Sequence, residues 1–170
     1  TFPERISQVA MIDGYMPLPE DGHNTAKHIA RAIYENKRYG AASPTGFQGY
    51  DRAVQARVNG FVPLQLEAAT ILAERGVIES EGLFYWRNDQ RLKAASMVKF
   101  GVDQLKSFLS AIIAPTVLIQ AENSAFSPDK AQAEALTWVP QMQIKKLAGS
   151  HHLHLEEGAA EVAKALQPLF

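Results

Sequence analysis

Three segments of the sequence, residues 6–12, 116–121 and 142–147, predict β-strands whose apolar residues come in runs rather than in strict alternation. Such runs are typical of strands that are covered on both faces, as in a parallel sheet. A helical pattern over residues 130–139 separates the second strand from the third, and another over residues 156–170 follows the third. The order strand, helix, strand, helix predicts the α/β class with a parallel sheet.

The helix expected at residues 130–139 has recognisable start and stop signals. Ser127 is a good N-cap, Pro128 suits the first helical position, and Asp129 complements the positive end of the helix dipole. Pro140 ends the helix, because proline lacks the backbone N–H that the next helical turn requires. These signals favour a helix that connects two neighbouring parallel strands.

Residues 15–113 differ in character from the segments on either side. They are more polar, their loops are rich in Gly, Pro, Ser and Asn, and residues 83–86 suggest a short strand or extended segment. We therefore expect two parts: residues 1–14 and 114–170 form the core, and residues 15–113 form a mostly helical cap or lid over the strand ends. The helical patterns of the cap occur at 25–37, 48–58, 64–75 and 103–113.

The composition excludes several classes of function. A formal net charge of −1, with no cluster of Lys and Arg, argues against a nucleic-acid partner. The absence of cysteine excludes a disulfide framework and a thiol nucleophile, and it fits a reducing compartment, so we expect the cytoplasm. No apolar run reaches membrane-spanning length, so no membrane partner is expected.

Polar candidates follow the carboxyl ends of all three predicted strands. Asp13 follows the first strand, residues 122–127 follow the second, and His151 follows the third. Ligand sites in parallel α/β sheets lie beyond these ends, so we expect the three positions to converge. A histidine on such a loop is a candidate general base, because an imidazole ordinarily titrates near neutral pH.

The three histidines at 151, 152 and 154 also raise the alternative of a metal site. Adjacent histidines on one extended loop point to different sides, however, and zinc sites usually recruit ligands from separate segments. We therefore expect no metal at His151, His152 and His154, and no cofactor.

Several motifs together resemble the C-terminal half of the α/β-hydrolase superfamily. Residues 9–14 resemble the strand that follows the helix after the nucleophile, and residues 114–122 resemble the penultimate strand. The Gly-Ser-His sequence at 149–151, with Glu156 beyond it, matches the family's catalytic-histidine loop. Within the superfamily, this loop and residues 87–92 most resemble the serine hydrolase-like proteins. The resemblance covers the whole chain and implies a parallel-sheet hydrolase core with an inserted helical cap.

The resemblance implies a Ser–His–acid triad in which a serine attacks an acyl carbon while His151 takes and later returns its proton. The nucleophile of this fold lies in a Gly-x-Ser-x-Gly pattern on a tight turn, and the sequence lacks that pattern. We therefore expect the nucleophile and the oxyanion loop upstream of Thr1, in an N-terminal half of the same fold that acts as the partner of this chain. Two alternatives remain open: a haloalkane dehalogenase-like enzyme with an aspartate nucleophile, and a catalytically degenerate binding module.

The acid of the triad is ambiguous from the sequence. Many relatives place an aspartate after the penultimate strand, near the position of Ser124, and this sequence has no aspartate there before Asp129. Asp13 and Glu122 are the two substitutes, since each follows a predicted strand directly. Asp13 is favoured slightly, because an aspartate at a strand end needs less reach.

The expected partner is a small-molecule substrate, fairly apolar, whose ester bond is hydrolysed under the helical cap. Tyr15, Met16, Trp86 and His152 are the candidate substrate-binding residues. Each has a plainer alternative, because aromatic residues and methionine more often pack in a core, and His152 would equally support its neighbour His151.

Overall fold

The computed structural model describes residues 2–126 and 130–169. The chain forms two compact units. One consists of Thr1–Glu20 and Phe100–Phe170, and we call it the sheet unit. The other consists of Asp21–Lys99, and we call it the helical unit.

The two boundaries between these units lie inside the segment expected as a cap, residues 15–113. The second boundary differs because helix α4 (Val102–Ser110) belongs to the sheet unit. Leu105 and Leu109 of α4 are buried in one apolar cluster with Trp138, which lies in the segment that precedes residue 142 in the sheet unit. The polar character of the surrounding segment predicts this helix as part of the cap, and the apolar face of α4 packs in the sheet unit instead.

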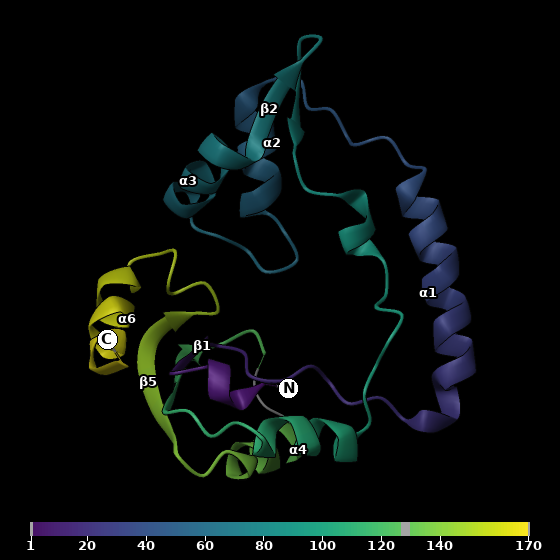
Figure 1. The fold of residues 1–170 in the computed structure, drawn as a ribbon. Coiled ribbons are helices and arrows are strands. Elements are labelled where there is room, and N and C mark those ends of the chain that lie inside the picture. The colour runs from purple at the N-terminus through teal and green to yellow at the C-terminus, as the bar shows by residue number, and fades with distance from the viewer. Residues whose placement is uncertain (1, 127–129, 170) are drawn as a thin grey trace. The chain divides into compact units, whose positions relative to one another are not determined.

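The sheet unit is built on a parallel three-stranded sheet in the order β1-β4-β5 (Figure 1). The strands are β1 (Val9–Ile12), β4 (Thr116–Asn123) and β5 (Met142–Ser150). All three were expected, and the α/β class with a parallel sheet is confirmed. Because the strands are parallel, their carboxyl ends lie at one edge of the sheet.

Burial differs among the three strands. Val117, Leu118 and Ile119 of β4 are fully buried or nearly so, because β4 is the central strand. Strands β1 and β5 each pair with β4 alone among the described residues, and their burial is mixed. The expectation that all three strands are covered on both faces therefore holds only for β4.

Helix α6 (Ala159–Leu166) covers one face of the sheet (Figure 1). It contributes Val162 to an apolar cluster with Ile119 of β4, and Leu153 lies fully buried in the same cluster. Lys145 of β5 also donates a hydrogen bond of 2.7 Å from Nζ to the backbone carbonyl of Ala165 in α6. These contacts fix the loop between β5 and α6 against the sheet.

The helix between β4 and β5 is shorter than the expected residues 130–139. It consists of α5 (Lys130–Ala135) followed by a short 3₁₀ helix, Leu136–Trp138. The start signals at residues 127–129 lie outside the described residues. The 3₁₀ turn comes just before Pro140, as expected from the missing N–H of proline.

The helical unit contains α1 (Thr25–Gly40), α2 (Tyr50–Val58) and α3 (Leu66–Gly76). These three helices match the predicted helical patterns to within a few residues. None of the helices in the described part of the chain has both the length and the apolar character that a bilayer crossing requires.

An antiparallel hairpin follows α3 in the helical unit, formed by β2 (Val77–Ser80) and β3 (Leu83–Trp86). The turn places Glu81 and Gly82 in left-handed backbone, which suits a tight hairpin. Strand β3 was foreseen, whereas the polar sequence of β2 gave no signal. Trp86 at the end of β3 donates a hydrogen bond of 3.0 Å from Nε1 to a carbonyl of α2.

Candidate active site

The first component of the site is a sharp turn at the end of β1. Asp13 has a φ of +49°, in the left-handed region that aspartate tolerates better than most residues. Its backbone N–H donates to the carbonyl of Ile119 in β4, at 2.7 Å. This turn directs the Asp13 side chain toward the loops that follow β4 and β5, where the side chain is only 4% exposed.

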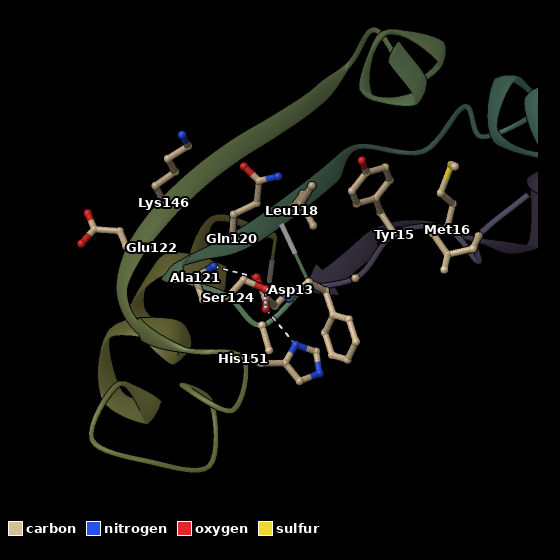
Figure 2. A pocket seen from close by; sticks show the side chains of 14 residues that line it. Asp13, Tyr15, Met16, Leu118, Gln120, Ala121, Glu122, Ser124, Lys146 and His151 are labelled. Carbon is tan, nitrogen blue, oxygen red and sulfur yellow. Dashed lines mark hydrogen bonds and ion pairs between the residues drawn. The ribbon is translucent and has the colours of Figure 1, made fainter. Parts of the chain in front are cut away.

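The buried Asp13 carboxylate accepts three hydrogen bonds (Figure 2). The backbone N–H of Ala121 donates to Oδ1 at 2.8 Å. Ser124 Oγ and His151 Nδ1 both donate to Oδ2, at 2.6 and 2.8 Å. A buried charge is costly unless its oxygens are satisfied, and here the donors come from the ends of the other two strands of the sheet, β4 and β5.

The loop that carries His151 is held in a tight conformation. Gly149 has a φ of +126°, and a Cβ at this position would lie 2.9 Å from Cβ of the buried Leu153. Ser150 Oγ donates to Glu156 Oε2 at 2.7 Å and accepts from the backbone N–H of residue 152 at 3.1 Å. The close packing requires glycine at 149, and the Ser150–Glu156 bond closes the loop.

The imidazole of His151 is held by its hydrogen bond to Asp13. With Nδ1 donating to Asp13, Nε2 has no hydrogen-bond partner among the described residues and is left with a lone pair. The side chain is 25% exposed, so this nitrogen remains accessible. The ring of Phe126 meets the imidazole edge-on, with centroids 4.7 Å apart. An imidazole held in this tautomer can act as a general base.

The other two histidines of the loop lie beside His151 without coming together as metal ligands. The ring centroids of His151 and His152 are 5.0 Å apart, and those of His152 and His154 are 6.4 Å apart. Burial lowers the pKa of His154, and the nearby imidazoles of His152 and His151 lower it further. No group of three or more His, Cys, Asp or Glu side chains in the described part of the chain is arranged to hold a metal ion.

A cavity of about 990 Å³ opens beside the Asp13–His151 pair. Tyr15 and Met16 line it and also pack against the apolar cluster of Leu105 and Trp138, and Figure 2 shows both side chains on one side of the pair. Polar side chains line the cavity on the other side, where Gln120 and Lys146 extend from β4 and β5. The cavity therefore combines apolar and polar walls beside the His151 imidazole.

No family model matches the chain. Over 179 aligned residues the chain is 25% identical to a serine hydrolase-like protein of Danio rerio, and the match covers 98% of this chain and 55% of that protein. The crystal structure of a hypothetical protein from Pseudomonas aeruginosa matches with a TM-score of 0.91 at 28% identity, over 99% of this chain and 60% of that one. The chain has the α/β-hydrolase fold.

The thioesterase domain from the curacin biosynthetic pathway has the same fold, with a TM-score of 0.79 at 20% identity over 98% of this chain and 59% of that domain. The resemblance to the α/β-hydrolase superfamily, and to its serine hydrolase-like proteins, is thus confirmed. The chain spans between half and two thirds of the length of these relatives.

In this α/β-hydrolase fold the two candidate acids differ in position. Asp13 contacts His151 directly, whereas Glu122 at the end of β4 has an exposed side chain. Figure 2 shows the Glu122 carboxylate on the side of Lys146, directed away from the imidazole. Glu122 borders the cavity but does not hydrogen-bond His151.

The other two candidate substrate-binding residues are Trp86 and His152. Trp86 belongs to the helical unit, where its ring packs on Gly76 and under the guanidinium of Arg57, 5.3 Å from the ring centroid. His152 packs beside His151 and is not among the residues that line the cavity. Both residues thus have packing contacts, Trp86 also borders a hollow within the helical unit, and substrate binding by either stays a prediction.

Sequence reasoning missed the contacts made by Ser124 and Phe126. Ser124 was noted only as the place where an aspartate is absent, and Phe126 attracted no attention. A serine directly after a strand is a common turn residue, so its bond to a carboxylate 111 positions away has no local signal.

Proposed function

We propose that this chain supplies the general base, His151, and the acid, Asp13, of a hydrolase that cleaves small ester-type substrates by acyl transfer. The observation that carries the proposal is the buried Asp13 carboxylate accepting from His151 Nδ1, which leaves Nε2 accessible beside a large cavity. The fold shared with serine hydrolase-like and thioesterase proteins supports the same reaction class.

The proposed reaction needs a hydroxyl nucleophile from outside these residues. As its oxygen attacks the acyl carbon, its proton passes to Nε2 of His151, and Asp13 stabilises the resulting imidazolium. His151 then protonates the leaving-group oxygen as the ester C–O bond breaks, leaving an acyl-enzyme. Water repeats the sequence: His151 takes its proton, the acid product leaves, and the nucleophile recovers its hydrogen.

The cavity lining favours a substrate with an apolar acyl or alcohol part. Met16, Leu18 and Leu118 line it together with the ring of Tyr15. Burial of these groups against a ligand contributes roughly 25 cal/mol per Å² of apolar surface. We also propose that the protein acts in the cytoplasm.

The partner in this proposal is an N-terminal half of the same fold, which carries the nucleophile. The relatives are longer than this chain, which spans 55% of the Danio rerio protein. Apolar side chains are exposed around a hollow of about 110 Å³ near the start of β1, where such a half would pack; Phe2, Ile6 and Phe108 are among them. Exposed apolar patches of this kind favour a contact with further polypeptide.

The test is labelling of the complete protein, with the proposed N-terminal half present, by a fluorophosphonate probe, together with turnover of a chromogenic short-chain ester. We expect His151→Ala to lower both by about 10³-fold or more, because the nucleophile loses its base. The matched control, His23→Ala, removes an exposed histidine of the helical unit and should leave both within about twofold. A folded complete protein that is neither labelled nor active would contradict the proposal and favour a binding module.

A further inference from the structure

The turn that follows β4 contacts both members of the Asp13–His151 pair. Ser124 Oγ donates to Asp13 Oδ2 at 2.6 Å and accepts from the backbone N–H of Phe126 at 3.0 Å. The ring of Phe126 in turn lies edge-on to His151. The turn at residues 124–126 therefore contacts both the Asp13 carboxylate and the His151 imidazole, which are themselves hydrogen-bonded to each other.

The Ser124 hydroxyl donates to the same Asp13 oxygen that accepts from the imidazole. Oδ2 of Asp13 receives both Ser124 Oγ and His151 Nδ1, while Oδ1 receives the N–H of Ala121. A carboxylate rotates easily about its terminal bond, since that torsion has broad minima. Donors on both oxygens, from two points of the β4 end, fix the plane of the carboxylate and so the direction in which it accepts from His151.

Phe126 restricts the imidazole from the other side. Its side chain is 48% exposed, and it nevertheless lies with ring centroids 4.7 Å from His151. Because the Phe126 N–H is bound to Ser124 Oγ, the same hydroxyl that orients the carboxylate also anchors the backbone beside the imidazole. Loss of that hydroxyl would release both constraints together.

We propose that Ser124 is a positioning residue, whose hydroxyl holds Asp13 and the 124–126 turn so that His151 keeps its proton on Nδ1. The proposal rests on the proposed function for its effect on turnover. It assigns to Ser124 no contact with substrate and no proton transfer. A serine at this position thus supplies a donor to the acid rather than an acid of its own.

The experiment removes the hydroxyl and reads the tautomer of His151 by ¹⁵N NMR, in parallel with steady-state kinetics of the complete protein. We expect Ser124→Ala to raise the fraction of His151 protonated on Nε2 and to lower kcat by about 10- to 100-fold, because a hydrogen bond to a charged group is lost. Ser124 lines the cavity, but its hydroxyl is engaged by Asp13 and by the Phe126 N–H, so KM should stay within about threefold. The matched control Ser110→Ala, an exposed serine of α4, should change neither quantity.

A second pair of variants separates the hydroxyl from the packing of the side chain. Thr and Val have nearly the same shape, so Ser124→Thr should retain the wild-type tautomer and Ser124→Val should lose it. Equal tautomer populations in the Thr and Val variants would overturn the inference, as would a wild-type tautomer in Ser124→Ala. Because the NMR readout needs no substrate, the expected tautomer change in an inactive protein would support the inference while contradicting the proposed hydrolase function.

Discussion

Two carboxylates follow neighbouring parallel strands in this molecule, and their surroundings differ sharply. Asp13 after β1 lies in left-handed backbone, is almost fully buried and accepts three hydrogen bonds. Glu122 at the end of β4 is exposed and directed away from the imidazole (Figure 2). Both residues satisfy the rule that polar groups at strand ends form a site. The comparison shows that a position at a strand end places a carboxylate near the site. Whether the carboxylate then hydrogen-bonds the imidazole depends on the backbone turn and on the donors around it.

The largest difference is expected between the two variants in which each carboxylate is replaced by its amide. Asp13→Asn should lower ester turnover of the complete protein by about 10²–10⁴-fold, because an amide no longer fixes the His151 tautomer as the carboxylate does. Glu122→Gln should lower it by less than about threefold, since a solvated carboxylate contributes little. Steady-state rates of the two variants, measured side by side, check the comparison.

The reverse ranking would assign the acid to Glu122 and break the comparison. A loss of similar size in both variants would indicate that each carboxylate acts on the imidazole. Circular dichroism of Asp13→Asn serves as the control, because the buried amide must still satisfy the N–H of Ala121.

The end of β5 extends the comparison to the third strand. Gly149→Ala should destabilise the protein by about 2–4 kcal/mol, because a Cβ there meets Leu153 at 2.9 Å and the backbone is left-handed. The matched control is Gly101→Ala in the same unit, where a Cβ meets only ordinary contacts of 3.8 Å or more. It should cost under about 1 kcal/mol. Urea unfolding of both variants gives the two free energies, and equal losses would contradict the constraint at Gly149.

The smallest expected effect concerns the pH dependence of stability. Because the pKa of His154 is lowered in the folded protein, mainly by burial, the unfolded chain binds a proton there first as the pH falls. The stabilising contribution is therefore present above the ordinary pKa of histidine and decreases as the pH falls below it. His154→Gln should flatten this part of the curve of unfolding free energy against pH, whereas His23→Gln, at an exposed site, should leave the curve unchanged. An unaltered slope in His154→Gln would contradict the assignment.

Much of the sheet and half of the site follow from the sequence alone. The apolar runs and the connecting helix predict parallel strands, and parallel strands place Asp13 and His151 at one edge of the sheet. The sequence favours Asp13 over Glu122 only slightly, because the choice depends on a left-handed turn and on donors from Ala121 and Ser124. Such contacts join residues more than a hundred positions apart and have no local pattern.

In the helical unit, too, one element could not be predicted from its own sequence. Strand β3 was foreseen because Leu83–Trp86 is aromatic and apolar, a composition that favours strands. Its partner β2 contains Glu79 and Ser80 and is exposed, so only the pairing with β3 stabilises it as a strand. Pairing is a property of two segments, and inspection of one segment cannot reveal it.

Leu153 has a consequence for any attempt to redesign this protein. It lies between two glycines, and a methyl group on Gly158 would come within 2.9 Å of its carbonyl oxygen, as one on Gly149 would approach its Cβ. Mutational libraries that spare this glycine–leucine–glycine set and diversify Met16 and Leu18 instead would alter ligand preference while retaining the geometry of the imidazole.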